Sequence, residues 1–159
     1  MTAPILVFAI GNESRGDDAL APLLLRQLQT ECIAQIELIE DYQLQVEHVT
    51  DLIGRSAVLF VDADVSCVEP FHLSEIAAAK DSSYTSHVMT PFALLHTYRQ
   101  VYGTDAPPAF LLRIRGYDFE LGNPLSDKAA DNLEVATEQV RALCADGNLQ
   151  SWRQRLVNV

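Results

Sequence analysis

Three short stretches of the chain carry side chains that could act together on a metal ion. Asp17 and Asp18 follow an apolar run and a Gly-Asn turn, while Asp62 and Asp64 follow the continuously apolar run AVLFV. His87 lies in a polar segment just before a predicted helix. Carboxylate oxygens and an imidazole nitrogen together suit a divalent transition metal of intermediate softness. One acid from each pair and His87 would supply only three ligands, leaving positions open to water or to another molecule.

Each of these residues also has a purely structural interpretation. One of Asp17 and Asp18 is expected to cap the helix that begins at Ala19, because a side-chain acceptor there satisfies free backbone N–H groups. Asp62 could be a turn former, although that role does not explain the buried strand before it. A loop histidine such as His87 is more often solvated than bound to metal. The remaining histidines are assigned structural or surface roles: His48, His72 and His96.

Alternating strand and helix patterns provide a scaffold on which these groups could meet. Strand-like runs are expected at residues 5–10, 36–40, 57–62, 71–76 and 109–114. Helical patterns are expected at residues 19–31, 45–53, 91–102 and 126–145, with Thr90 and Gly103 bounding the third. This alternation predicts a three-layer α/β/α fold around a mostly parallel five-stranded sheet.

The predicted sheet has one antiparallel strand. The run at residues 71–76 follows Asp62 too closely for a helical crossover, so it should pair antiparallel at an edge. In a parallel sheet the loops after neighbouring strands share one rim, which is where ligands bind in open α/β sheets. The acid pair of the first loop, Asp62 and His87 could therefore lie together although they are far apart in the chain.

Size and composition favour one domain over residues 1–159 of a cytoplasmic protein. The chain is 48% hydrophobic, enough for a substantial core, but no apolar run approaches the roughly 18 residues of a membrane span. No basic segment precedes the first apolar run, as a signal peptide would require. The cysteines form no CxxC pair and are expected to be reduced: Cys32, Cys67 and Cys144.

The net charge limits the class of partner. Acidic residues outnumber Lys and Arg by 22 to 11, and the formal net charge is −11. Such a surface repels phosphate backbones, so nucleic-acid binding is disfavoured. The charge has two interpretations, a partner with a basic face or solubility alone, and solubility is the preferred one.

The segment GNESRGDDALAP at residues 11–22 resembles the opening motif of the [NiFe]-hydrogenase maturation proteases. These endopeptidases remove the C-terminal extension of the hydrogenase large-subunit precursor once nickel has been inserted. FVDA at residues 60–63 is similar to the second acidic motif of the family, and His87 before a helix is similar to its third. EDYQLQVEH at residues 40–48 is similar to the version that serves soluble, NAD-reducing bidirectional hydrogenases. The resemblance covers roughly residues 5–143.

The resemblance implies which residues contact nickel and carry catalysis, and what the substrate is. Asp18, Asp62 and His87 would contact nickel and carry catalysis, the nickel being supplied by the substrate rather than held as a tightly bound cofactor. Five residues would support them, with Asp17 holding the loop or capping the helix: Gly11, Asn12, Gly16, Asp17 and Asp41. This chain has Asp18 where many relatives have Glu, and Asp41-Tyr42 where other members have Asp-Gly. The implied partner is the hydrogenase large-subunit precursor.

Two other classes of protein share part of this pattern. A magnesium-dependent phosphoacceptor receiver domain also has an acid pair after the first strand and an Asp after the third. Here, however, the pair lies beyond Gly11 rather than at the strand end, and Arg113 and Arg115 stand where a receiver has a lysine. A nucleotide-binding module is disfavoured because the loop lacks GxGxxG and GK[ST], and two acids at the helix start would repel phosphate. GxSxG and HExxH motifs are also absent.

Overall fold

A five-stranded sheet forms the centre of the protein. The computed structural model describes residues 2–31, 33–80 and 89–156, and every structural statement below concerns these residues. The strands are β1 (Ile5–Ile10), β2 (Ile36–Asp41), β3 (Ala57–Asp64), β4 (Phe71–Ile76) and β5 (Ala109–Arg115). They lie in the order β2-β1-β3-β5-β4, and only β4 runs antiparallel to its neighbour. The predicted sheet, including its antiparallel edge strand, is confirmed.

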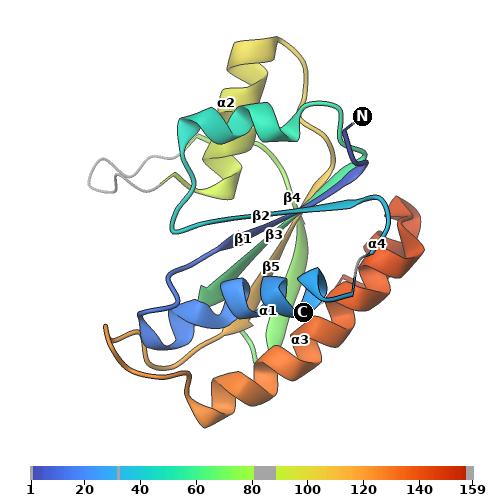
Figure 1. Cartoon of the computed structure of the whole chain (residues 1–159). Helices are drawn as coiled ribbons and strands as arrows, with labels where there is room; N and C mark the ends of the chain where they lie inside the picture. Colours follow the sequence, from blue (N-terminus) through green and yellow to red (C-terminus); the bar gives the residue numbers. More distant parts are fainter. Residues whose placement is uncertain (1, 32, 81–88, 157–159) are drawn as a thin grey trace.

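Helices cover both faces of this sheet (Figure 1). They are η1 (Gly16–Ala19), α1 (Leu20–Gln29), η2 (Val46–Leu52), α2 (Pro91–Tyr102), α3 (Asp127–Asp146) and α4 (Leu149–Gln154), where η marks a 3₁₀-helix. α1, α3 and α4 pack on one face, and η2 and α2 pack on the other. The three-layer α/β/α prediction is therefore correct.

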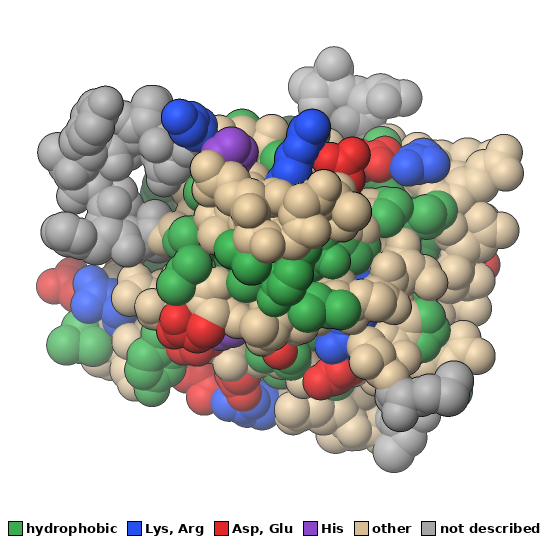
Figure 2. Space-filling view, turned by 90° about the horizontal axis from the view of Figure 1, so that it is seen from above, with side chains coloured by type: hydrophobic (Ala, Val, Ile, Leu, Met, Phe, Trp, Pro, Cys, Tyr) green, Lys and Arg blue, Asp and Glu red, His purple; other side chains and the backbone are tan. Residues whose placement is uncertain are grey.

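The inner strands are buried on both faces, as their continuous apolar sequences predict. All six residues of β1 are buried, and Val7 and Ala9 face α1 and α3 while Leu6 and Phe8 face η2 and α2. Phe8 lies beside Phe60 of β3, with the ring centroids 6.1 Å apart. The core therefore has two layers, one on each side of the sheet. Figure 2 shows the outer side of η2 and α2, where apolar side chains lie between charged ones.

Capping residues fix the ends of the two long helices. The Thr90 hydroxyl accepts a hydrogen bond from the Ala93 N–H, and Ser126 does the same for Ala129. Gly103 and Gly147 follow the last turns in the left-handed conformation that favours glycine. These ends agree with the predicted ranges to within a residue.

Two predicted helices differ in form from the observed ones. Residues 45–53 form a 3₁₀-helix rather than an α-helix, and the first helix begins with the 3₁₀ turn η1 before α1 starts at Leu20. Short 3₁₀ turns are common where an α-helix begins, and hydrophobic periodicity alone does not distinguish them. β3 also continues through Asp64, so Asp62 and Asp64 lie in the strand rather than after it.

The sheet order does not favour the receiver alternative. A flavodoxin-like receiver sheet has the order 2-1-3-4-5 with parallel strands, whereas here β5 lies inside the sheet and β4 is an antiparallel edge. Among the described residues, no helix is both long and apolar enough to cross a membrane.

Candidate functional site

The candidate site lies where β1 and β3 end side by side. Ile10, the last residue of β1, is paired in register with Asp62 of β3 on one side and with Asp41 of β2 on the other. The chain then turns through residues 11–15 and brings Asp18 back toward the end of β3. Gly11, the residue after Ile10, packs against the backbone of Asp18, so Asp18 lies at the same rim as Asp62. Burial raises the pKa of Asp62, and the negative charge of Asp18 raises it further. The structure thus brings together two of the three predicted metal contacts.

Asp18 is positioned by the loop that it follows. Its Oδ2 accepts a hydrogen bond from the Asn12 N–H at 2.8 Å, and Asn12 Oδ1 in turn accepts one from the Ser14 N–H at 2.9 Å. Burial raises the pKa of Asp18, although the Asn12 N–H and the charge of Arg15 act in the opposite direction. The residue remains partly exposed, and only Oδ2 of its carboxylate accepts a hydrogen bond within the described residues.

Asp62 is the most strongly perturbed acid at this rim. Burial, together with the negative charges of Asp18 and Asp64, raises its pKa to about 7. Two carboxylates held close in a partly desolvated place repel one another, and a proton or a cation relieves that repulsion. The pair can therefore share a proton near neutral pH.

Asp17 has a different environment from its neighbour and a structural role. It is completely buried; its Oδ1 accepts from the Ser126 N–H, and its Oδ2 accepts from the Ser126 hydroxyl and two backbone N–H groups, those of Tyr117 and Asp118. Burial opposes ionisation, but these four bonds outweigh it and lower the pKa of Asp17. Asp17 thus ties the β1 loop to the segment before α3.

The expectation that one acid of the pair caps the following helix is wrong. Neither η1 nor α1 has a side-chain hydrogen bond at its N-terminus. The capping pattern fails because both carboxylates are used elsewhere, Asp17 by the distant 117–126 segment and Asp18 by Asn12. Of the two supporting roles suggested for Asp17, the structure supports holding the loop.

Two glycines of the motif allow the backbone to pack closely here. A Cβ on Gly11 would lie 2.2 Å from the backbone oxygen of Asp18, and one on Gly16 would lie 2.3 Å from that of Asp118. Gly16 also has a φ of +54°, in the left-handed region. Both positions therefore require glycine for close approach of the loop to its neighbours, which keeps Asp18 near the strand ends.

Asp41 is held by His48, for which the sequence predicts only a structural or surface role. His48 Nδ1 accepts the Gln45 N–H at 2.8 Å, so the ring proton lies on Nε2, which is 3.3 Å from Asp41 Oδ2. The His48 ring also packs edge-on against Phe8, with centroids 4.7 Å apart. The three-residue spacing from Gln45 to His48 is that of a capping box and accounts for the bond between these two residues, whereas the contact of His48 with Asp41 has no local sequence signal.

Other polar side chains extend the rim toward β4. Arg113, paired in register with Asp62, contacts Asp64 Oδ2 through Nη1 and His72 Nδ1 through Nη2, each at 3.2 Å. Burial opposes ionisation of Asp64, but hydrogen bonds from Ser66 and the charge of Arg113 lower its pKa. Asp64 is thus engaged by an arginine, which leaves Asp62 as the available acid of β3.

The third predicted contact, His87, lies outside the described residues. Within residues 2–31, 33–80 and 89–156, no cluster of three or more His, Cys, Asp or Glu side chains has metal-binding geometry. Two cysteines, Cys67 and Cys144, are buried, and burial raises the pKa of both thiols, that of Cys144 to about 11. Neither thiol has the lowered pKa of a catalytic cysteine.

Solved structures of [NiFe]-hydrogenase maturation proteases have the fold of this chain. The hydrogenase maturating endopeptidase HybD from E. coli has a TM-score of 0.70 and 22% sequence identity, over 90% of this chain and 93% of that chain. The maturation protease HycI from Thermococcus kodakarensis has a TM-score of 0.68 and 19% identity over the same shares. HybD from T. kodakarensis has a TM-score of 0.64 and 16% identity, over 88% and 98%.

Sequence comparison adds nothing to this likeness. No model of a protein family matches the chain, and no curated protein does. At 16 to 22% identity the structural matches establish a common fold. The function must therefore be argued from the site.

Proposed function

We propose that this protein is a maturation endopeptidase that removes the C-terminal extension of a [NiFe]-hydrogenase large-subunit precursor after nickel insertion. The observation that carries the proposal is the convergence of Asp18 and Asp62 at the ends of β1 and β3. Support comes from the fold, which the chain has in common with proteins described as hydrogenase maturation proteases. The loop and its glycines serve to hold Asp18 in this place.

In this proposal the nickel ion belongs to the substrate, and the protein recognises the substrate by binding that ion. Asp18, Asp62 and His87 contact the ion and so fix the adjoining peptide in one orientation at the rim. A metal ion held there can also polarise the scissile carbonyl or a water molecule. Two carboxylates and one imidazole bind a free divalent ion weakly. Weak binding is useful, because tight binding of free nickel would prevent the protein from sensing a loaded substrate.

We further propose that the substrate belongs to a soluble, NAD-reducing bidirectional hydrogenase and that the protein acts in the cytoplasm. The support is the stretch EDYQLQVEH at residues 40–48, which ends β2 and forms the first half of η2. In this stretch Asp41 and His48 are in contact, and Tyr42 is exposed beside the site loop.

Cleavage of a purified precursor, with and without nickel, tests the proposal. We expect the wild-type protein to shorten only the nickel-loaded precursor, and Asp18→Asn, Asp62→Asn and His87→Ala each to reduce the rate at least about a hundred-fold. Asp131→Asn, an exposed aspartate on α3, is the matched control and should cleave normally. Full activity of Asp62→Asn and His87→Ala would remove the trio from the mechanism, and equal cleavage without nickel would refute the sensing role.

A further inference from the structure

β2 forms one edge of the sheet, and half of its backbone groups face away from β1. The Gly11 N–H donates to the Asp41 oxygen, and the Ile5 N–H donates to the Gln35 oxygen. Successive residues of a strand alternate in direction, so the odd-numbered residues of β2 face β1. The N–H and C=O groups of Ile36, Leu38 and Glu40 therefore point outward. An outward row of this kind can bind an additional strand.

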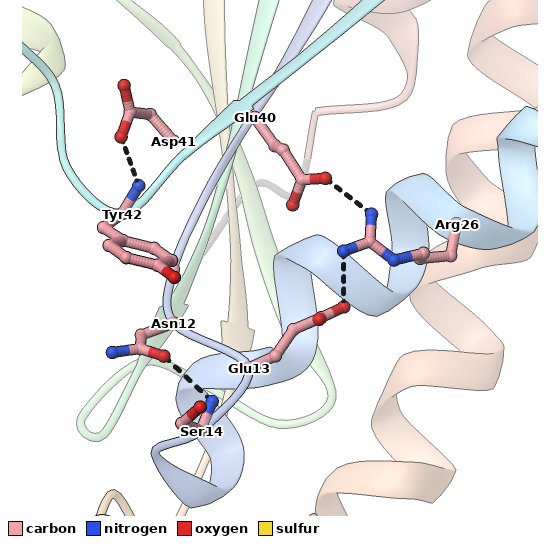
Figure 3. A pocket seen from close by; sticks show the side chains of 8 residues that line it. Asn12, Glu13, Ser14, Arg26, Glu40, Asp41 and Tyr42 are labelled. Carbon is pink, nitrogen blue, oxygen red and sulfur yellow. Dashed lines mark hydrogen bonds and ion pairs between the residues drawn. The ribbon is translucent and has the colours of Figure 1, made fainter.

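A polar cavity of about 330 Å³ lies at the end of this edge nearest the site (Figure 3). Arg26 of α1 crosses it, bonded to Glu40 of β2 and to Glu13 of the site loop, the latter at 2.9 Å. Two carboxylates, those of Glu13 and Glu40, meet one guanidinium in the cavity, which leaves an excess of one negative charge. The Asp41 carboxylate points away from it, toward His48. The Tyr42 ring, 72% exposed, stands at its side. A basic side chain fits this lining by charge and by contact with the aromatic ring.

A second cavity, of about 380 Å³, lies beside the same strand toward its start. Its lining is mostly apolar: Leu28, Gln29, Ile33, Ile36, Glu37 and Leu38. Alternate residues of a strand lie on one face, so the side chains of Ile36, Leu38 and Glu40 share the side covered by α1. The two cavities therefore lie in line along one side of the outward-facing edge.

We infer that the edge of β2 binds an extended, basic and apolar polypeptide segment as an additional strand. Its main chain bonds to the outward groups of Leu38 and Glu40, while alternate side chains enter the two cavities. The polar cavity also includes Asn12, whose N–H holds Asp18, so the bound segment leads directly into the candidate site. The inference rests on the proposed function, because the segment belongs to the hydrogenase precursor next to the bond that is cut.

Residue-resolved amide exchange of the wild-type protein tests this inference. Adding nickel-loaded precursor should slow exchange of the outward Leu38 and Glu40 amides at least about ten-fold, since each amide gains a hydrogen-bond acceptor. The Glu37 and Ile39 amides face β1 and are already bonded, so they are the internal reference and should change little. Unchanged exchange at Leu38 and Glu40, with a precursor that the protein does cleave, would overturn the inference.

A pair of substitutions at Leu38 separates the backbone donor from the side chain. Leu38→Pro removes the outward N–H without breaking a bond to β1, and proline is tolerated on an edge strand. Leu38→Ala keeps the N–H and loses the same apolar contacts. We expect KM for precursor cleavage to be about five-fold higher for Leu38→Pro than for Leu38→Ala, with equal kcat. Equal KM values would contradict strand addition, whereas a wild-type protein that cleaves no precursor would contradict the proposed function itself.

Discussion

Adjacent aspartates in this protein differ in chemistry because their surroundings differ. Asp17 is surrounded by four hydrogen-bond donors, which lower its pKa, whereas Asp18 receives one backbone N–H and its pKa is raised. Asp62 has the highest pKa of the three because its carboxyl group is largely desolvated and lies near the negative charges of Asp18 and Asp64. The ionised form is stabilised at Asp17, which has a structural role, and destabilised at Asp18 and Asp62, which marks these two as the candidate functional acids.

Replacing Asp62 by Asn should stabilise the metal-free protein at high pH. The pKa of Asp62 rises from 3.8 to about 7 on folding, so between these values the folded state binds more protons than the unfolded state. Its unfolding free energy therefore falls as pH rises through this window. Asp62→Asn has no such loss. Its free energy of unfolding should exceed that of the wild type by at most about 4 kcal/mol at pH 8 and by little at pH 4. Urea unfolding in the presence of a chelator measures it, and a difference independent of pH would refute the explanation.

Replacing Asp17 by Asn should have the opposite effect. Asparagine offers one acceptor oxygen where Asp17 uses two, so its amide N–H₂ would face either the Ser126 N–H or the donors bonded to Oδ2. We expect a loss of about 2 kcal/mol in the free energy of unfolding at neutral pH. Because the pKa of Asp17 is lowered on folding, the stabilisation from its charge is present above the unfolded value and is lost at acid pH.

The same unfolding series, with Asp131→Asn as the surface control, measures the effect of Asp17. The difference between wild type and Asp17→Asn should shrink as the pH falls through the lowered pKa of Asp17. Equal stability of the two proteins at neutral pH would show that the 117–126 segment does not depend on this carboxylate.

The short C-terminal helix α4 has one fully buried side chain, Trp152, and Leu149 packs against the same core. Trp152 is buried, its Nε1–H donates to the Leu143 oxygen of α3 at 2.8 Å, and its ring lies edge-on to Phe110 of β5. The Arg153 guanidinium makes two bonds to Glu75 at the surface. The tail beyond α3 is therefore part of the layer that covers this face of the sheet.

Trp152→Ala should release α4 and expose the edge of the core. Removing a buried tryptophan costs about 3 to 5 kcal/mol, from lost apolar burial and the cavity that remains. Thermal unfolding followed by far-UV circular dichroism measures the change, with the exposed Val135→Ala of α3 as the control. A shift in Tm no larger than that of Val135→Ala would mean that α4 contributes nothing to the fold.

At the scale of the whole molecule, the sheet could be predicted because its signals are local. β1 and β3 are continuous apolar runs, and the short connection from β3 to β4 leaves no room for a crossover, which fixes β4 as antiparallel. The ends of α2 at Thr90 and Gly103 could also be predicted, because helix capping depends on neighbouring residues in the sequence. The 3₁₀ turns could not be predicted, because 3₁₀- and α-helices place apolar residues at similar spacing.

The roles within the site depended on contacts between distant segments. The hydrogen bonds between Asp17 and Ser126 join residues more than a hundred positions apart, and no local sequence pattern predicts them. Convergence of Asp18 and Asp62 could be predicted from strand topology alone, since the ends of neighbouring parallel strands share one rim. The placement of His87 stays a prediction, because it lies outside the described residues.

Anomalous diffraction from crystals soaked in cadmium shows whether Asp18, Asp62 and His87 can contact one ion, since cadmium is a soft divalent ion whose position is seen in its own anomalous signal. We expect one strong peak at the rim, contacted by Asp18 Oδ1, an Asp62 oxygen and a His87 ring nitrogen, and loss of that peak in Asp62→Asn crystals. A His87 side chain on another face of the molecule, or no cadmium between Asp18 and Asp62 at saturating concentration, would contradict this expectation.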